Sequence, residues 1–217
     1  MKASLVAEHP SVAPHLDPRT GAQRARLLEG MTQAVAEKGY AEATVADAVR
    51  HARVSRGTFY ALFRSKEACF LEAYRHGVEV LEARIDAALA AAGDDWRAQL
   101  RAGLRAYLDC LVDEPAFART WVLDIHTAGP PAQALRDDVL RRFAARYRAS
   151  LARAGTGVLP GDDALFVLAA GVDQLIGARL RAGGLGELDD LTTTLETCAV
   201  ALLAGTADLE KGTTPWT

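Results

Sequence analysis

The chain has 217 residues, of which 50% are hydrophobic and 24% are charged, so its composition is that of a folded globular protein. No apolar run approaches the roughly 18 residues that cross a bilayer, and residues 1–18 lack the apolar core of a signal peptide. We therefore expect a cytoplasmic protein with no membrane partner. The three cysteines (Cys69, Cys110 and Cys198) lie far apart in apolar helical patterns and are expected to be reduced.

The net charge of −3 conceals an uneven distribution along the chain. Residues 1–70 carry ten Lys and Arg against seven Asp and Glu, whereas residues 71–217 carry 15 against 21. The N-terminal third is therefore basic and the remainder is acidic. The net charge alone does not exclude a nucleic-acid partner for the N-terminal part.

Apolar residues three and four apart dominate the sequence and almost no strand pattern occurs, which predicts an all-α protein of about nine helices. A flexible N-terminal arm is expected over residues 1–18 and a flexible tail over residues 208–217. The expected helices, in chain order, cover about 21–38, a short segment from 44, then 55–62, 65–92, 94–112, 115–128, a long one that follows "GPP" (129–131) and ends at about 154, and finally 162–182 and 188–207.

Two predicted N-caps define a pair of short helices early in the chain. Thr44, followed three residues later by Asp47, forms a variant of the capping box. Ser55 caps the next helix, and the sequence "HARVS" between the two helices leaves room only for a tight turn. This spacing is typical of a helix-turn-helix, which we place at about 43–63.

The first turn of the second helix in such a motif meets base edges in the major groove. We therefore predict base contacts from Ser55, Arg56, Gly57 and Thr58. The Arg56 guanidinium can bind guanine O6 and N7 together, and Gly57 lets the backbone approach the DNA.

Phosphate contacts are predicted for side chains that lie at helix N-termini or carry a polar tip. Thr44 and Lys66 stand in the first turns of their helices, where phosphate is favoured. Tyr60 can reach a phosphate through its hydroxyl. The apolar residues Phe59, Leu62 and Phe63 point to the opposite side and hold the helix in place.

Residues 20–74 closely resemble the DNA-binding domain of the tetracycline-repressor (TetR) family of transcription regulators. The resemblance is carried by Gly39–Tyr40 and by the run "TVADAVRHARVSRGTFYALFRSKEACFLEAY". Leu62 stands where the family commonly has His, which removes one possible phosphate contact. The resemblance implies a three-helix DNA-binding domain over residues 19–75 and a ligand-binding and dimerisation domain over residues 76–207.

The same resemblance implies a homodimer in which the last two long helices pair with their copies. Such a dimer presents two recognition helices to half-sites about 34–36 Å apart, so we expect a palindromic operator on double-stranded DNA. The apolar residues expected at the dimer interface are Leu168, Val172, Leu175, Ile176, Leu195 and Leu202.

A small, largely apolar effector is expected to release the operator, with repression as the family's usual mode. The candidate pocket combines large apolar residues with polar anchors, although the same aromatic residues could simply form a core. The candidate residues are Tyr107, Cys110, Phe117, Trp121, Phe143, Tyr147 and Phe166, with Asp124, His126 and Gln174 as polar groups.

Other functional classes receive less support from the sequence. Paired aspartates at 94/95, 162/163 and 189/190 fit N-caps better than metal ligands, so neither a metal nor a cofactor is expected. Asp124 and His126 would point about 200° apart on a helix, and no catalytic motif occurs, so we predict no enzyme. A helical scaffold or partner-binding module without sequence-specific DNA binding is the alternative.

Overall fold

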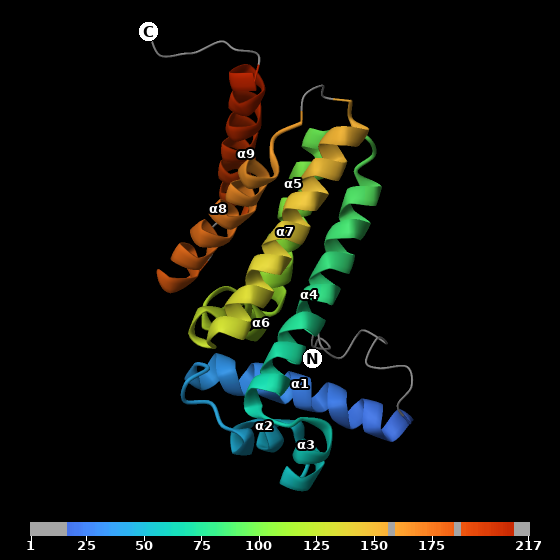
Figure 1. Ribbon diagram of the computed structural model, residues 1–217, viewed down its shortest axis with the longest axis vertical. Coiled ribbons are helices and arrows are strands. Elements are labelled where there is room, and N and C mark those ends of the chain that lie inside the picture. The colour runs from blue at the N-terminus through green and yellow to red at the C-terminus, as the bar shows by residue number, and fades with distance from the viewer. Residues whose placement is uncertain (1–16, 156–158, 185–187, 211–217) are drawn as a thin grey trace. The chain divides into compact units, whose positions relative to one another are not determined.

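The computed structural model describes residues 17–155, 159–184 and 188–210, which form nine α-helices and one short 3-10 helix (Figure 1). The predicted all-α class is confirmed, since the described residues contain no strand. Most of the predicted N-terminal arm lies outside the described residues. The last helix extends to Glu210, and the rest of the predicted tail, 211–217, also lies outside them.

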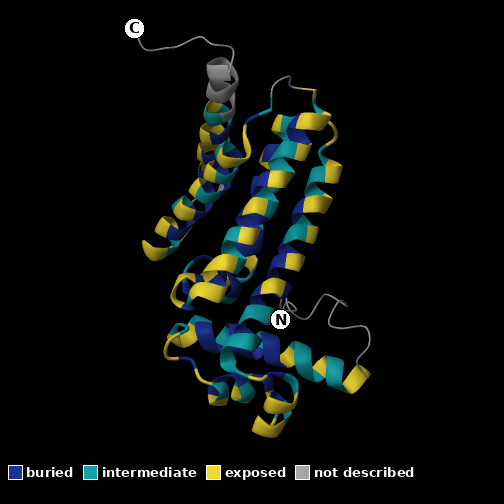
Figure 2. Cartoon of the chain, viewed as in Figure 1, coloured by how far each residue is buried: buried dark blue, intermediate teal, exposed yellow. Residues whose placement is uncertain are grey.

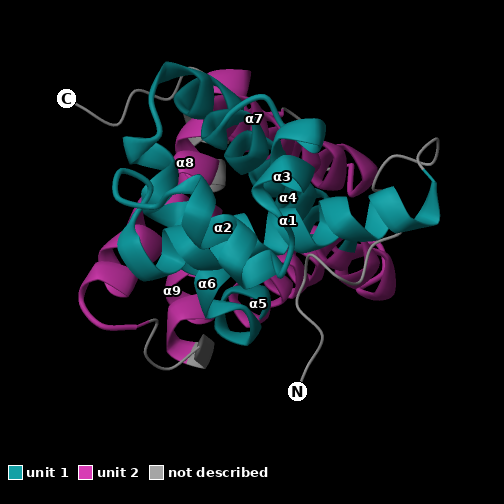
Figure 3. Ribbon diagram, turned by 90° about the horizontal axis from the view of Figure 1, so that it is seen from below, with its two compact units in different colours: residues 1–83, 110–135 teal, residues 84–109, 136–217 magenta. Residues whose placement is uncertain are grey.

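The chain divides into two compact units (Figure 3). Unit 1 consists of residues 1–83 and 110–135, and unit 2 consists of residues 84–109 and 136–217. Unit 1 contains α1 (Pro18–Lys38), α2 (Val45–Ala52), α3 (Arg56–Leu62), α6 (Pro115–Val122) and the 3-10 helix η2 (Asp124–Thr127). Unit 2 contains α8 (Asp162–Arg181) and α9 (Leu188–Glu210). Three helices contribute to both units, namely α4 (Lys66–Ala91), α5 (Trp96–Asp113) and α7 (Pro130–Arg153).

The core of unit 1 is organised around α1, which contacts α2, α3 and α6. Leu27, Leu28, Met31 and Val35 lie at helical spacing on α1 and are all buried. Figure 2 shows the buried residues of the chain in dark blue. Gly30 lies on the same side, where an added Cβ would come within 3 Å of backbone atoms of α2. The missing side chain therefore allows α1 and α2 to pack closely.

The other side of unit 1 is closed by aromatic residues from α3 and α4. Phe59, Phe63, Phe70 and Tyr74 are all buried, as their helical spacing predicts. Burying each such ring stabilises the fold by about 1.5–3 kcal/mol. These contacts hold α3 by its inner face and leave its outer face exposed.

The core of unit 2 is formed by apolar residues of α5, α7, α8 and α9. Leu104, Val139, Leu165, Ile176 and Leu195 are buried, and α8 contacts α9. The interior also contains charged and polar side chains that pair across helices. Arg136 of α7 pairs with Asp173 of α8, and Ser150 of α7 donates a hydrogen bond to Gln99 of α5.

Several helix boundaries differ from the sequence predictions, two of them for a clear local reason. Helix α1 begins at Pro18 rather than at residue 21, because the Asp17 carboxylate caps it by accepting from the amides of Arg19 and Thr20, each at 3.1 Å. The predicted helix over 115–128 ends at Val122 and continues as η2. There the Thr127 hydroxyl donates to the Asp124 carbonyl at 2.8 Å and competes with the α-helical pattern.

Candidate nucleic-acid interface

The N-terminus of α2 is built by reciprocal capping between Thr44 and Asp47. The Asp47 amide donates to Thr44 Oγ1 at 3.2 Å, and the Thr44 amide and hydroxyl donate to Asp47 Oδ2 at 3.1 and 2.7 Å. The predicted capping box is therefore confirmed. Both the hydroxyl and the amide of Thr44 thus already have a carboxylate partner.

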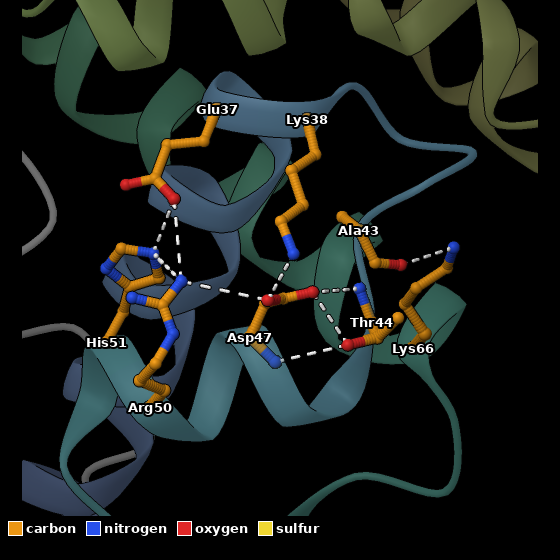
Figure 4. A network of polar contacts seen from close by, with 8 residues as sticks. All are labelled: Glu37, Lys38, Ala43, Thr44, Asp47, Arg50, His51 and Lys66. Atoms are coloured by element: carbon orange, nitrogen blue, oxygen red, sulfur yellow. Dashed lines mark hydrogen bonds and ion pairs between the residues drawn. The ribbon is translucent and has the colours of Figure 1, made fainter.

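Asp47 is also the centre of an ion-pair network that joins α1 to α2 (Figure 4). Lys38 Nζ donates to Asp47 Oδ1 at 2.6 Å, and Arg50 lies 3.7 Å from the same oxygen. Glu37 Oε2 completes the network, at 3.6 Å from Arg50 and 3.0 Å from His51 Nε2. The Lys38 hydrogen bond is the main reason why the pKa of the Asp47 carboxyl lies well below its usual range.

The turn between α2 and α3 is centred on Arg53. Its backbone adopts a left-handed conformation, with φ 52° and ψ 46°, and it is the only described residue other than glycine with positive φ. The amides of Arg53 and Val54 donate to the carbonyls of Arg50 and Val49 at 3.3 and 3.2 Å, the pattern of a Schellman motif. The turn therefore ends α2 with an Arg where Gly is usual.

The residues predicted to contact bases gather at the exposed beginning of α3. Ser55 caps the helix, because its Oγ accepts from the Thr58 amide at 2.9 Å, and the two hydroxyls lie 2.9 Å apart. Arg56 and Gly57 are exposed in the same turn. The structure thus brings all four candidates together on one surface of unit 1.

The inner face of α3 anchors this surface. Phe59 and Phe63 are buried with ring centroids 5.7 Å apart, and Leu62 is partly buried. Tyr60 points outward and is 53% exposed, with its ring edge-on to Phe59 at 5.3 Å. The predicted division of α3 into an inner apolar face and an outer polar face is present in the structure.

The Lys66 ammonium, which was predicted to contact a phosphate, already has partners within the protein. Its Nζ donates to the carbonyl oxygens of Tyr40 at 2.8 Å and Ala43 at 3.0 Å, and it lies 4.3 Å from the centroid of the Tyr40 ring. The ammonium therefore binds the loop between α1 and α2. Its predicted phosphate contact, like that of Thr44, stays a prediction.

Other exposed cations lie next to α3 and were not singled out from the sequence. Arg53 precedes the helix and Arg64 follows it, and both are exposed. Within the described residues, neither forms an ion pair or a side-chain hydrogen bond. The sequence alone does not distinguish these arginines from the paired cations, because the ion-pair partners of the others lie far away in the chain, as Glu72 does from Arg24.

Five of the ten pocket candidates belong to unit 1. Phe117 and Trp121 of α6 are buried in an aromatic group, in which Trp121 stacks on Tyr74 with centroids 4.7 Å apart and planes at 10°. The Phe117 ring lies 5.6 Å from that of Trp121. Cys110 is also buried, whereas His126 is exposed.

Asp124, the remaining candidate in unit 1, is a buried carboxylate that faces the α1–α2 loop. It accepts a hydrogen bond from the Tyr40 amide, and its Oδ2 lies 3.6 Å from Arg119 Nε. Burial raises the pKa of the Asp124 carboxyl above its usual value. This residue therefore links η2 to the loop that Lys66 also holds.

The other five candidates belong to unit 2. Tyr107 is buried with its ring 6.2 Å from that of Phe143, and burial raises the pKa of Tyr147 to about 12. The Arg141 guanidinium lies 5.6 Å from the centroid of the Phe166 ring, and Gln174 is exposed. The ten residues are thus divided equally between the units, and the predicted pocket stays a prediction.

A surface cavity of about 360 Å³ does occur within unit 2, between α4, α5 and α7. None of the ten candidates lines it. Its lining residues are Asp86, Leu89, Ala90, Gly93, Asp94, Gln99 and Arg153.

The predicted dimer residues lie on α8 and α9, but several are already covered. Leu168, Val172, Ile176 and Leu195 are buried within the single chain, whereas Leu175 and Leu202 are partly exposed. The outer face of α8 instead presents other residues. These are Val167, which is 58% exposed, with Gly171, Gln174 and Ala178 along the same helix.

The part of the chain that the structure describes holds no cluster of three side chains able to bind a metal ion. Asp95 acts at a helix start, since its Oδ1 accepts from the Arg97 amide at 3.1 Å. Asp162 and Asp163 lie in the first turn of α8 but do not cap it, and Asp162 instead accepts from Arg148 at 2.6 Å. No described helix is long and apolar enough to span a bilayer.

Residues 27–73 match the family model described as "Bacterial regulatory proteins, tetR family". This segment contains α2, α3 and the capping network described above. No curated protein matches the chain in sequence.

Solved structures of transcriptional regulators share the fold at low sequence identity. FadR from Bacillus subtilis, in complex with stearoyl-CoA, has a TM-score of 0.72 at 14% identity, covering 83% of this chain and 97% of its own. The fatty acid degradation regulator FadR from Bacillus halodurans gives 0.73 at 17% identity, covering 84% and 94%. A TetR-like transcriptional regulator from Rhodococcus sp. RHA1 gives 0.61 at 21% identity, covering 88% and 100%.

These comparisons agree with the geometry of unit 1. In a helix-turn-helix, the second helix is capped, exposes its first turn and is held from behind by apolar side chains, and α2 and α3 have this arrangement. Residues 27–73 thus match the model of the tetR family of bacterial regulatory proteins over the helix-turn-helix, within a chain that shares the all-helical fold of these solved structures.

Proposed function

We propose that the protein is a transcriptional repressor that binds a palindromic operator as a homodimer and is released by a small, largely apolar molecule. Residues 19–75 would read the DNA, and residues 76–207 would bind the effector and the second subunit. Repression is the family's usual mode. Such a repressor acts in the cytoplasm, where its operator is.

The exposed first turn of α3 is the observation that carries this proposal. Arg56 and Gly57 are exposed there, and Ser55 and Thr58 stand beside them. An arginine in this position can bind guanine through two hydrogen bonds, which discriminate between bases by about 1–3 kcal/mol. A helix buried on one face by Phe59 and Phe63 can present these groups without unfolding.

Selection of bound duplexes from a random DNA pool tests the proposal directly. We expect enrichment of an inverted repeat whose half-sites are centred about one helical turn apart. Arg56→Gln should relax the preference at one position of each half-site, since it removes a base contact. Recovery of no consensus, with only salt-sensitive non-specific binding, would instead favour a helical scaffold.

The homodimer is supported by the outer face of α8. Val167 is 58% exposed although it is apolar, and Gly171 and Ala178 beside it would let a second helix approach closely. Light scattering after size-exclusion chromatography should give twice the monomer mass. Val167→Glu should shift the protein towards monomer, whereas Ala145→Glu, a change at an exposed residue of α7, serves as a comparison.

The effector is proposed to contain a long apolar group. The aromatic group of Trp121, Phe117 and Tyr74 in unit 1, and that of Tyr107 and Phe143 in unit 2, supply apolar surface. FadR from Bacillus subtilis, which shares the fold, was crystallised with stearoyl-CoA. Long-chain acyl-CoA thioesters are therefore the first effectors to test, with free CoA as the control that lacks the apolar chain.

Release of DNA would require that effector binding and operator binding are coupled. Helix α4 supplies Lys66–Ala83 to unit 1 and the residues from 84 to Ala91 to unit 2, so one continuous helix belongs to both. A coupling of about 1–3 kcal/mol would weaken operator binding roughly 5- to 150-fold. Operator affinity measured with and without saturating stearoyl-CoA gives this factor, and an unchanged affinity would exclude that effector.

A further inference from the structure

The cations near α3 fall into two groups when their partners are compared. Four are held within unit 1, since Arg24 pairs with Glu72, Lys38 with Asp47, and Arg50 with Glu37, while Lys66 binds carbonyl oxygens. Arg53, Arg56 and Arg64 form the second group. Each is exposed, and none has an ion-pair partner within the described residues.

Arg64 and Arg53 occupy opposite ends of α3. Arg53 stands three residues before Arg56, where the helix begins, and Arg64 stands two residues after Leu62, where it ends. A seven-residue helix is about 10 Å long, while the major groove is about 12 Å wide. If α3 lies across the groove, its two ends approach the two sugar-phosphate backbones that border it.

The backbone of Arg53 gives independent support. It holds a left-handed conformation that residues with a Cβ rarely adopt, and no described contact of its side chain compensates for this. The conformation ends α2 through the Schellman hydrogen bonds, a role that glycine would perform at lower conformational cost. Residues kept in unfavourable conformations often serve binding rather than folding.

We infer that Arg53 and Arg64 are phosphate-contacting residues that bind the two borders of the major groove, while Lys66 chiefly holds the Tyr40–Ala43 loop. This inference rests on the proposed DNA-binding function. It adds two phosphate contacts that carry no base preference. It also gives Lys66, which the sequence suggested as a phosphate ligand, a structural role.

The salt dependence of operator binding tests this assignment. Each phosphate contact contributes about −0.9 to the slope of log affinity against log salt concentration. The probe is the duplex obtained by selection with the wild-type protein. Arg53→Gly and Arg64→Gln should each make the slope less steep by about 0.9 and should weaken binding equally for all sequences, unlike Arg56→Gln.

The melting temperatures of the variants distinguish a lost phosphate contact from a loss of protein stability. Arg53→Gly should melt at the same temperature as wild type or higher, because glycine adopts the left-handed conformation freely. Arg53→Lys keeps the charge and should keep the slope. Lys66→Met should lower the melting temperature, because it removes the hydrogen bonds to the Tyr40 and Ala43 carbonyls.

Arg75→Gln is the matched control. Arg75 is also an exposed arginine of unit 1, but it lies nine residues beyond Lys66, or roughly 14 Å further along α4. Its removal should leave the slope unchanged. The inference is overturned if Arg53→Gly and Arg64→Gln keep the wild-type slope, or if Lys66→Met alone reduces it without lowering stability. If wild-type protein selects no duplex, the proposed function itself fails.

Discussion

The ring of Phe117 on α6 occupies the space directly over Gly77 on α4. A Cβ added to Gly77 would overlap with the ring carbons of Phe117. The ring cannot move away easily, because it is buried and lies against the Trp121 ring at 5.6 Å. The absence of a side chain at Gly77 therefore determines how closely α6 packs on α4 within unit 1.

Gly77→Ala should consequently destabilise the protein. Overpacking of this kind costs about 1–3 kcal/mol, and each kcal/mol lowers the melting temperature by roughly 2–4 °C in a chain of this size. Gly21→Ala is the matched control, since Gly21 is also helical and an added Cβ there meets no other atom. It should be neutral or stabilising, by up to about 1 kcal/mol. Equal melting temperatures for the two variants would contradict the close packing of Phe117 on Gly77.

The ion pair between Arg136 and Asp173 should be essential to unit 2, because both side chains are nearly buried, at 12% and 6% exposure. Asp173→Asn leaves a buried guanidinium without its counter-charge, which costs about 3–5 kcal/mol. Urea denaturation measures this loss. The surface pair of Arg142 and Asp138 offers the comparison, and Asp138→Asn should change the free energy of unfolding by less than about 0.5 kcal/mol.

The stabilising effect of Asp47 should depend on pH in a defined direction. Its pKa in the folded state lies below 3.8, so its contribution is complete above that value and is lost as the pH falls through the folded-state pKa. Asp47→Asn should therefore be less stable than wild type at pH 7. The difference should shrink as the pH is lowered below about 4. A difference that stays constant down to pH 3 would mean that the carboxylate charge is not what Lys38 stabilises.

Asp124 should show the opposite dependence on pH. Burial raises its folded-state pKa above 3.8, so the folded protein binds this proton more tightly and the free energy of unfolding falls as the pH rises through that range. Asp124→Asn keeps an oxygen that can accept from the Tyr40 amide and cannot ionise. The variant should gain stability relative to wild type as the pH rises from about 4, and then keep that gain. Urea titrations of both proteins at several pH values would measure this gain. If Asp124→Asn lost stability relative to wild type as the pH rose, the proposed cost of burying a charged Asp124 would be contradicted.

The helix-turn-helix was predictable from sequence because its signals are local. Thr44 and Asp47 cap each other three residues apart, and Ser55 caps α3 through Thr58 at the same spacing. The apolar stripe of α1 likewise follows from helical periodicity alone. Asp17 could have been recognised as a cap as well, because a proline follows it at the first helical position.

Long-range partners could not be predicted in this way. Lys66 has the residue type and helix position of a phosphate ligand, yet the carbonyls that it binds lie 23 and 26 residues earlier in the chain. The hydrogen bond of Asp124 could not be predicted either, since its partner Tyr40 lies in a loop far away in the sequence. Helical periodicity predicted that Leu168 and Ile176 are buried. It could not distinguish burial within the chain, which the structure shows, from burial against a partner subunit.

Unit 1 is discontinuous in sequence, and this affects how it can form during synthesis. Residues 110–135 complete it, as shown by the Thr120 hydroxyl, which donates to the Thr32 carbonyl 88 residues earlier. On the ribosome, α1 to α3 can fold while residues 84–135 are still being made, which takes roughly 3–10 s at 5–20 residues per second. During that interval the surface around Tyr74 and Gly77 lacks its cover of Phe117 and Trp121, so the nascent chain presents an apolar face to chaperones.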